Sequence, residues 1–141
     1  MTALPITPIY TGIVTVSGGR KGVARSDDGR LDVEVGLPDA SGGPKQTNPE
    51  QLFAAGYASC FGSAVMAIAR RQKLEIGPVS ITAHVSLGKT EGGQWSLAVE
   101  LHIQIPDLER DAASALVQAA NQICPYSYAT QGNIQVALIL D

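Results

Sequence analysis

Two stretches in the middle of the chain alternate strictly between apolar and polar residues. Every second residue is apolar from Val79 to Leu87 and again from Trp95 to Ile105, so each stretch places its apolar side chains on one face. This alternation predicts two half-buried strands, and Glu91–Gly93 between them predicts a hairpin turn. The two histidines of the chain, His84 and His102, fall on the outward positions of these strands.

Shorter strand-like runs lie near both ends of the chain. Ile9–Val16 is rich in β-branched residues, Leu31–Gly36 alternates, and Ile134–Leu140 predicts a last strand. The glycine-rich segment Ser17–Gly22 predicts a turn that presents one or two cations. Pro38–Thr47 is dense in turn formers and predicts a loop, too short to separate two domains.

A long apolar segment after this loop predicts a helix with a well-marked start. Asn48 is a suitable N-cap, Pro49 suits the first helical position, and Glu50 places negative charge in the first turn. The helix is expected to end at the cations Arg70 and Arg71. Because it is apolar on nearly every face and rich in Ala, Gly and Ser, it is expected to be buried on most sides.

A second helix is expected to open at Asp107 and to stop at Pro125, because the residue before a proline is pushed out of helical geometry. Cys124 would then lie at its C-terminal edge. Grouped strands with two main helices indicate an α+β fold with antiparallel pairing. The expected apolar stripe of this helix is Leu108, Ala112, Ala115, Leu116, Ala119 and Ile123.

Composition and charge narrow the class of protein. The 141 residues predict one domain spanning 1–141, with 45% hydrophobic and 16% charged residues. The formal net charge of −3 and the lack of a basic run argue against nucleic-acid binding. The longest unbroken apolar run, Ala64–Ala69, is far shorter than the ~20 residues of a membrane span. With no secretory signal pattern in Met1–Tyr10, a soluble cytoplasmic protein is expected.

The two cysteines are the first candidates for chemistry. Cys60 and Cys124 are 64 positions apart, which excludes a CxxC motif, and two buried structural thiols are one interpretation. A reactive cysteine needs an influence that favours its thiolate. Cys60 lies 12 residues past Asn48, about 18 Å from the positive end of the helix, so another cation must supply the field. Arg20 on the glycine-rich turn is the best candidate, and a solvated turn residue is the alternative.

Hydrolase and metal chemistry find less support in the residues. A cysteine hydrolase needs a histidine base beside its thiol, whereas His84 and His102 are expected on a strand surface. The same four residues could be counted as a Cys₂His₂ zinc site, but the paired spacings typical of structural zinc are missing. The sequence therefore predicts no bound metal and no bound cofactor.

Two cysteine motifs resemble those of a known family. Asn48–Phe61 (NPEQLFAAGYASCF) and Ile123–Ser127 (ICPYS) are similar to the signatures of the organic hydroperoxide resistance proteins, a subfamily of the OsmC-like superfamily. Gly18–Arg20, Leu31–Val33 and Val99–Leu101 match other segments of that family in the same order. The resemblance covers essentially the whole chain.

This resemblance implies an OsmC-like fold and a cysteine-based peroxidase that reduces organic and fatty-acid hydroperoxides to alcohols. It implies that Cys60 is the peroxidatic thiolate and Cys124 the resolving thiol, joined in a disulfide during turnover. Arg20 and Glu50 would hold Cys60 ionised and orient the peroxide. The resemblance further implies an intertwined homodimer with sites at the subunit interface, re-reduced by dihydrolipoyl groups on a lipoylated protein.

The spacing of Glu50 and Cys60 adds an inference about the interface. Ten residues along one helix separate them by about 15 Å, too far for both to touch one substrate. Either the helix kinks near Gly56, or the Glu50 beside a given Cys60 comes from the other subunit. We expect a site at the interface.

The substrate is expected to be apolar, because an apolar pocket binds an alkyl tail better than it binds hydrogen peroxide. Each side chain that would form this pocket is equally suited to an ordinary core. The candidates are Phe53, Phe61, Met66, Ile68, Tyr126 and Tyr128.

The sequence departs from the family pattern at Trp95, Tyr128 and Gln131, none of which is assigned to chemistry. Three alternatives remain beside the organic hydroperoxide peroxidase. They are an OsmC-type peroxidase of broader peroxide tolerance, a small-molecule or lipid-binding α+β domain with structural cysteines, and a redox sensor that oxidises once without turnover.

Overall fold

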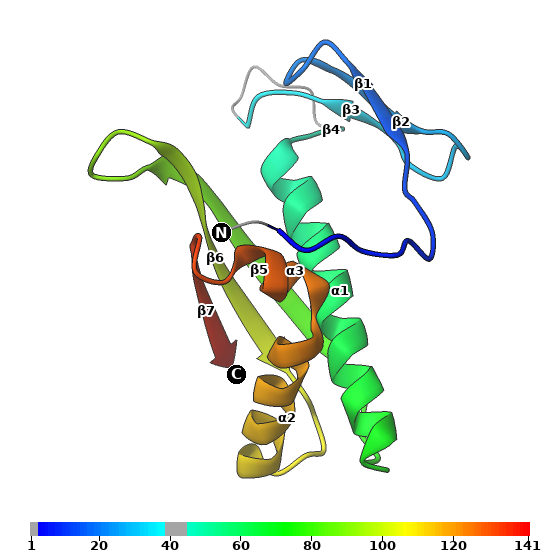
Figure 1. Ribbon diagram of the computed structural model, residues 1–141, viewed down its shortest axis with the longest axis vertical. Helices are drawn as coiled ribbons and strands as arrows, with labels where there is room; N and C mark the ends of the chain where they lie inside the picture. The colour runs from blue at the N-terminus through cyan, green and yellow to red at the C-terminus, as the bar shows by residue number, and fades with distance from the viewer. Residues whose placement is uncertain (1–2, 39–44) are drawn as a thin grey trace. The chain divides into compact units, whose positions relative to one another are not determined.

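The computed structural model describes residues 3–38 and 45–141, and the chain divides into two compact units, Met1–Pro49 and Glu50–Asp141. Each unit has its own β-sheet (Figure 1). Along the chain, strands come in groups that are separated by helices, which confirms the predicted α+β class. The single domain over residues 1–141 stays a prediction.

The first unit contains a sheet in the order β1-β2-β3-β4. Strands β1 and β2 pair antiparallel, as do β2 and β3, whereas β4 pairs with β3 in parallel. The β1–β2 connection is the predicted glycine-rich turn, where Gly18 and Gly19 adopt positive φ and the Lys21 amide donates to the Gly18 carbonyl. The strands are β1 (Val14–Ser17), β2 (Gly22–Ser26), β3 (Asp32–Val35) and β4 (Gln46–Thr47).

Two predictions for this unit need correction. The run Ile9–Val16 is not one strand, because only its last residues join β1 and residues 9–13 form no regular element. The predicted loop Pro38–Thr47 ends in strand β4, while 39–44 lie outside the described residues. The segment before β1 leaves large apolar side chains exposed, which the strand interpretation did not anticipate. These are Leu4, Ile6, Ile9 and Tyr10, each at least 79% exposed.

The second unit contains a sheet in the order β5-β6-β7. The long hairpin of β5 (Ser80–Lys89) and β6 (Trp95–Gln104) confirms both the predicted strands and their turn. Strand β7 (Gln135–Leu140) lies parallel to β6, so the expectation of purely antiparallel pairing is wrong in both sheets. In the second sheet, the pairing direction depends on how the helices α2 (Arg110–Ile123) and α3 (Pro125–Thr130) return the chain to the sheet, which strand alternation does not encode.

Helix α1 (Pro49–Arg71) has the predicted bounds, with Glu50 in its first turn and both arginines in its last. The helix was expected to be buried on most sides, but only one of its faces is buried in the single chain. The opposite face is exposed. By length and composition α1 would qualify as a membrane span, although the core helix of a soluble protein passes the same test. The hydropathy of α1 is high on average because no charged residue stands between Glu50 and Arg70, although its longest unbroken apolar run is only Ala64–Ala69.

Helix α2 (Arg110–Ile123) begins three residues later than predicted. Asp107 has a left-handed backbone (φ +68°), and the Glu109 side chain caps the helix by accepting from the amides of Asp111 and Ala112. The buried stripe also differs from the predicted one, since Ala115 and Ile123 are exposed. The residues that are buried are Ala113, Leu116, Val117 and Ala120.

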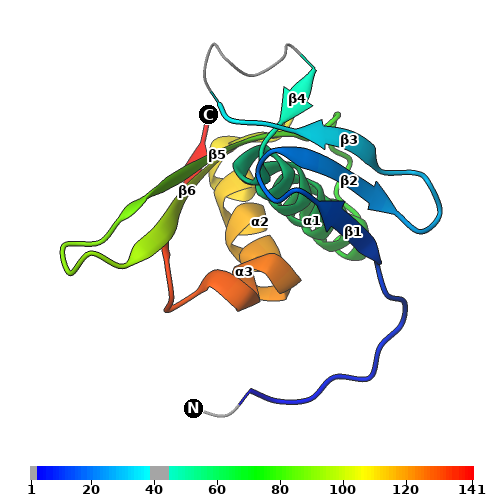
Figure 2. The same cartoon turned by 90° about the horizontal axis from the view of Figure 1, so that it is seen from above.

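The core of the second unit lies between its helices and one face of the β5-β6-β7 sheet (Figure 2). Tyr57 and Phe61 of α1 are fully buried there, together with Leu101 and Ile103 of β6 and Leu116 of α2. The apolar face predicted for the central strands is therefore the core face. Ser80, Thr82, His84, Glu100 and His102 lie on the opposite face.

Candidate active site

The structure brings together the two cysteines that lie 64 positions apart in sequence. The Cys124 thiol donates a hydrogen bond to the Cys60 sulfur, and the two Sγ atoms are 3.5 Å apart. Both are free thiols. Because a disulfide bond is about 2.05 Å long, a shift of about 1.5 Å would join the sulfurs.

A break between two helices places Cys124. Pro125 ends α2 as predicted, and it also opens a short helix, α3 (Pro125–Thr130), which the sequence analysis missed. Cys124 joins the two helices with an extended backbone (φ −70°, ψ 119°), while its own amide still bonds to the Ala120 carbonyl. This conformation is the one favoured before proline, so Pro125 fixes the backbone of the thiol that contacts Cys60.

The two thiols differ in access. Cys124 is fully buried, whereas Cys60 is half-buried on α1. An approaching molecule can therefore meet the Cys60 sulfur first. The geometry by itself distinguishes an outer thiol from an inner one.

Local surroundings act on Cys60 in opposite directions. Burial raises the pKa of the Cys60 thiol above its ordinary value, and the neighbouring Cys124 thiol adds to this rise. The backbone N–H of Tyr126 hydrogen-bonds to the Cys60 sulfur and lowers the pKa, but burial outweighs it. That N–H is in the first turn of α3, where helix amides lack an acceptor within the helix.

A polar and aromatic cluster holds α3 against α1. The buried Tyr57 hydroxyl is 3.0 Å from Ser127 Oγ and 3.1 Å from Thr130 Oγ1, and all three residues are buried. The rings of Phe53, Tyr57 and Tyr126 contact one another at centroid distances of 5.7–6.3 Å. Because α3 begins directly after Cys124, this cluster fixes the position of that thiol.

Helices α1 and α3 also contact each other where the Tyr126 side chain packs against Gly56. A Cβ atom at Gly56 would lie 2.9 Å from the Tyr126 hydroxyl and 3.3 Å from its ring, closer than packing permits. Helix α1 runs without interruption through Gly56, so the glycine serves the approach of Tyr126 and makes no kink. The roles of Gly56, Tyr57, Ser127 and Thr130 were missed, because the hydrogen bonds link residues 70 and 73 positions apart.

An apolar pocket of about 440 Å³ is lined by the residues that follow Cys124 in the chain, although neither cysteine lines it. Pro125 and Tyr126, which directly follow Cys124, form part of its wall together with Phe53 of α1. The remaining lining residues are Leu97, Ala129, Thr130, Asn133 and Ile134. Phe53 and Tyr126, which were predicted to line a substrate pocket, therefore do line an apolar pocket.

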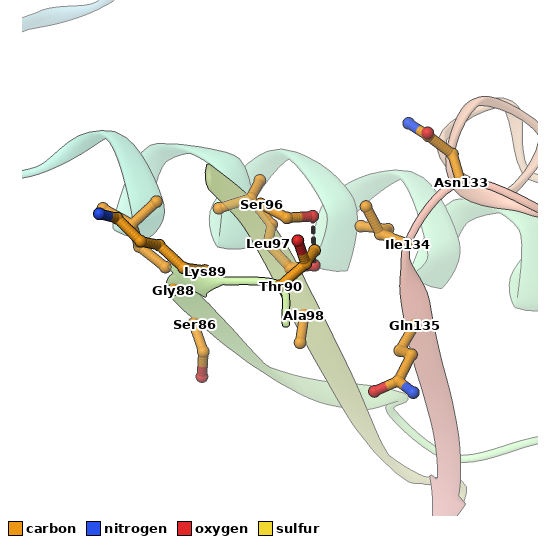
Figure 3. Close-up of a pocket in the computed structure, with 11 residues that line it drawn as sticks. Ser86, Gly88, Lys89, Thr90, Ser96, Leu97, Ala98, Asn133, Ile134 and Gln135 are labelled. Carbon is orange, nitrogen blue, oxygen red and sulfur yellow. Dashed lines mark hydrogen bonds between the residues drawn. The ribbon is translucent and has the colours of Figure 1, made fainter. Parts of the chain in front are cut away.

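The other residues proposed for the pocket lie elsewhere. Phe61 and Ile68 are buried in the core, and Met66 and Tyr128 are exposed at 51% and 69%. A second, more polar pocket of about 430 Å³ lies at the hairpin end of the sheet (Figure 3). Lys89 and Thr90 line it, and it shares Leu97 of β6 and Asn133 and Ile134, just before β7, with the apolar pocket.

Arg20 and Glu50 occupy the elements predicted for them. Arg20 lies in the β1–β2 turn of the first unit, and Glu50 lies in the first turn of α1. Because α1 is continuous, Glu50 and Cys60 of one chain are separated by about 15 Å along its axis. The alternative of a kink near Gly56 finds no support, because α1 runs as one helix from Pro49 to Arg71 (Figure 1).

The residues suited to holding a metal lie apart from the thiols. Among the described residues, His84, Glu100 and His102 form a group whose ligand atoms lie within 4.8 Å of one another. Neither cysteine belongs to this group, which argues against the Cys₂His₂ interpretation.

Comparison with known proteins agrees with the paired cysteines. The model of the family of OsmC-like proteins matches residues 42–139. The chain is 46% identical to the organic hydroperoxide resistance protein of Xanthomonas axonopodis pv. citri (strain 306), over 98% of this chain and 99% of that protein. It is 48% identical to the organic hydroperoxide resistance protein OhrB of Bacillus subtilis (strain 168), over 94% and 98%.

Solved structures show the same likeness. The crystal structure of OhrB from Bacillus subtilis matches with a TM-score of 0.89 at 47% identity, covering 95% of this chain and 100% of that one. An organic hydroperoxide resistance protein from Elizabethkingia anophelis matches with a TM-score of 0.87 at 43% identity, covering 96% and 99%. With both its sequence and its fold matched over nearly their full length, this chain belongs to the OsmC-like family and, within it, to the organic hydroperoxide resistance proteins.

Proposed function

We propose that this protein is a cysteine-dependent peroxidase that reduces organic and fatty-acid hydroperoxides to alcohols. The observation that carries the proposal is the Cys60–Cys124 pair, an accessible thiol 3.5 Å from a buried one, and the two residues after Cys124 line an apolar pocket. The relatives named for organic hydroperoxide resistance support the same substrate class.

The reaction follows from the two thiols. The Cys60 thiolate attacks the terminal oxygen of the hydroperoxide, and the O–O bond breaks. The released alkoxide takes up a proton to become the alcohol, while Cys60 becomes a sulfenic acid. Cys124 then attacks the Cys60 sulfur, forming the disulfide and releasing water. The buried thiol needs to meet only its neighbour, which suits the resolving role.

Arg20 and Glu50 supply the charges that the thiol pair lacks in this proposal. Since burial raises the pKa of Cys60, a guanidinium beside the sulfur would favour the thiolate and stabilise the leaving alkoxide. Glu50 would orient that guanidinium. The continuous helix supports a Glu50 supplied by the second subunit, because one chain cannot bring Glu50 and Cys60 together within α1.

A homodimer is part of the same proposal. The exposed apolar residues Leu4, Ile6, Ile9 and Tyr10 lie in one segment of the chain, which a second copy would cover. On α1, Met66 is a further large apolar side chain that is exposed in the single chain.

The apolar pocket supports a preference for organic peroxides over hydrogen peroxide. An alkyl or acyl tail gains about 0.8 kcal/mol for each methylene it buries, whereas hydrogen peroxide has nothing to bury. We place the protein in the cytoplasm, with dihydrolipoyl groups of a lipoylated protein as the reductant. The family resemblance supports the reductant, whereas the location rests on the expectation from the sequence.

Mass spectrometry tests the core of this proposal. Reduced protein receives one equivalent of cumene hydroperoxide or, in parallel, of hydrogen peroxide. We expect the loss of two hydrogen atoms, mapped to a Cys60–Cys124 link within one chain and formed faster with the organic peroxide. Dihydrolipoamide should then restore the thiols.

Two variants sharpen the result. Cys124→Ser should stop at the Cys60 sulfenic acid and proceed to sulfinic acid, because no resolving thiol is present. Cys60→Ser should remove the fast reaction altogether. Oxidation of the unaltered protein at the rate of a free thiol would contradict the peroxidase proposal and favour a lipid-binding domain. Equal rates with both peroxides would favour a broader OsmC-type peroxidase, and a single oxidation that no reductant reverses would favour a sensor.

A further inference from the structure

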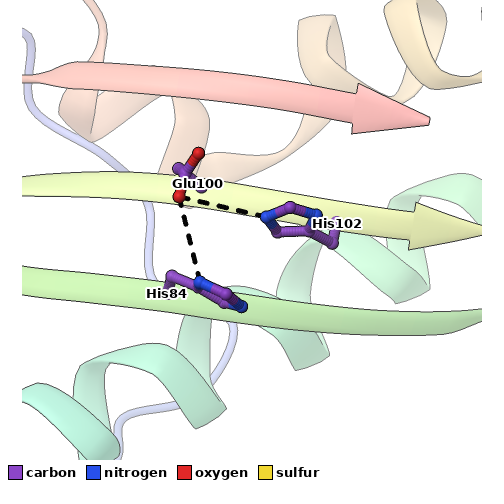
Figure 4. Close-up of side chains that lie close together, drawn as sticks. All are labelled: His84, Glu100 and His102. Carbon is purple, nitrogen blue, oxygen red and sulfur yellow. Dashed lines mark ion pairs between the residues drawn. The ribbon is translucent and has the colours of Figure 1, made fainter. Parts of the chain in front are cut away.

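The outer face of the β5-β6-β7 sheet carries a cluster of metal-ligating side chains. His84 of β5 is paired directly with Glu100 of β6, and His102 follows two residues later on the same face. Figure 4 shows the two imidazoles and the carboxylate projecting together from adjacent strands. Residues 16 and 18 positions apart in sequence become neighbours through strand pairing, so ligand spacing along the chain did not reveal them.

The candidate ligand atoms lie slightly farther apart than the ligands of a bound metal ion. Glu100 Oε1 lies 3.8 Å from His84 Nδ1 and 4.0 Å from His102 Nε2, and the imidazole centroids are 4.5 Å apart. One ligand atom from each residue lies within 4.8 Å of the others. A tetrahedral zinc ion with bonds of about 2.0–2.1 Å separates its ligands by roughly 3.4 Å. Side-chain rotation alone can close the difference, because His84 and Glu100 are exposed.

One nitrogen of the cluster lacks a partner. His102 Nε2 is buried from solvent, and within the described part of the chain it has no hydrogen-bond partner. A buried polar atom left in this state costs free energy, so such atoms call for an explanation. Glu100, at 4.0 Å, is too distant to hydrogen-bond with it.

The opposite nitrogen of the same ring indicates which atom would bind an ion. Asp141 Oδ1 lies 3.5 Å from His102 Nδ1, on the far side of the imidazole from the cluster. A carboxylate that accepts the proton of one ring nitrogen leaves the other nitrogen unprotonated and directs it at a metal. Asp141 lies on the side of His102 where such a carboxylate is expected, and a small movement from 3.5 Å would let it accept the Nδ1 proton.

We propose that His84, Glu100 and His102 form a binding site for one divalent transition-metal ion, of which Zn²⁺ is the probe. Two imidazoles and one carboxylate suit Zn²⁺, Co²⁺, Ni²⁺ or Cu²⁺, whereas Mg²⁺ and Ca²⁺ prefer oxygen ligands alone. Asp141 is a positioning residue that acts through His102. The site is independent of the proposed peroxidase, because it uses neither cysteine and lies on the sheet face opposite the core.

Calorimetric titration of the untagged protein with Zn²⁺ tests the site. The titration uses the Cys60→Ser, Cys124→Ser chain, so that thiols cannot bind the ion. We expect one Zn²⁺ per chain and, with Co²⁺, the visible absorption of a tetrahedral nitrogen–oxygen site. His84→Ala and His102→Ala should each weaken binding roughly a hundredfold, and Asp141→Asn about tenfold through lost support of His102.

A matched control separates the cluster from general surface binding. Glu100→Gln should weaken Zn²⁺ binding, whereas Glu91→Gln, the same change in the exposed hairpin turn, should leave it unchanged. Thermal unfolding without metal confirms that each variant folds. No stoichiometric binding to the double-serine chain, or binding that survives both histidine substitutions, would overturn the proposal.

Discussion

The surroundings of Cys60 change the pKa of its thiol in opposite directions. Burial raises the pKa of its thiol, and the Tyr126 amide offsets part of this rise. The described neighbours of the second unit therefore leave the thiol less acidic than an exposed cysteine. The proposed function requires the Cys60 thiolate, so we propose that the positive charge of Arg20 lowers the pKa of this thiol.

Replacement of Arg20 tests this proposal through the pH dependence of Cys60 oxidation. The thiolate is the reactive form, so a raised pKa moves the rise in rate to higher pH. Arg20→Gln should shift the pH–rate profile toward higher pH. The rate at neutral pH should then fall about tenfold for each pH unit of the shift. The measurement is the rate of Cys60 oxidation by cumene hydroperoxide across the pH range.

The neighbouring cation provides the control for this experiment. Lys21→Gln removes one positive charge from the same turn and should leave the profile in place. If Arg20→Gln lowered the rate equally at every pH, Arg20 would not act on the ionisation of Cys60.

At the scale of elements, contact between α1 and α3 sets the distance between the sulfurs. Tyr57 anchors α3 through Ser127 and Thr130, and Gly56 admits the Tyr126 ring. Because Cys124 immediately precedes α3, a displacement of α3 from α1 would separate the thiols.

Adding a methyl group at Gly56 should produce this displacement. Alanine is favoured over glycine inside a helix by about 1 kcal/mol, but its Cβ would meet the Tyr126 hydroxyl at 2.9 Å. Gly56→Ala should therefore slow formation of the Cys60–Cys124 disulfide and gain no stability. Rapid-quench mass spectrometry and thermal unfolding measure the two effects.

Gly62 on the same helix is the matched position. A Cβ there would make only an ordinary contact, 3.6 Å from the Ile81 side chain. Gly62→Ala should raise the free energy of unfolding by about 0.5–1 kcal/mol and leave disulfide formation unchanged. Equal behaviour of the two variants would show that the approach of Tyr126 does not control the thiols.

The sequence predicts elements best where one local signal decides them. Asn48, Pro49 and the terminal arginines marked both ends of α1, and alternation marked β5 and β6. Helix α3 was missed because six residues are too few for a periodic pattern. Helix α2 was placed early because the left-handed backbone at Asp107 leaves no trace in apolar spacing. The S–S contact depends on tertiary packing, so only the family resemblance could anticipate it.

At the scale of the whole molecule, one chain leaves apolar surface uncovered and its proposed site incomplete. In the proposed homodimer, a second subunit would cover the exposed residues of the N-terminal segment and supply the Glu50 that lies about 15 Å from Cys60 within one chain. A site assembled from two chains has a property that a site within one chain lacks, because two defective subunits can complement each other.

Mixing of inactive variants tests this property. Cys60→Ser and Glu50→Gln subunits, unfolded and refolded together in equal amounts, should recover about a quarter of the full activity. Half of the dimers are then mixed, and each mixed dimer has one intact site of two. Peroxidase turnover with dihydrolipoamide measures the recovery.

A second mixture controls for refolding. Cys60→Ser and Cys124→Ser subunits should recover no turnover, because the two thiols that react together lie 3.5 Å apart in one chain. Failure of the first mixture to exceed the second would place Glu50 and Cys60 of the working site in the same chain.

In the proposed catalytic cycle, the unequal burial of the two sulfurs also determines which sulfur the reductant attacks. Once the disulfide has formed, a reductant can reach only the Cys60 sulfur, because Cys124 is enclosed on all sides. The mixed disulfide with the reductant must therefore form on Cys60, with Cys124 as the leaving thiolate. A trapped covalent adduct would be attached at position 60 whichever reductant the cell provides. Cys60 meets both the oxidant and the reductant, and Cys124 reacts with Cys60 alone.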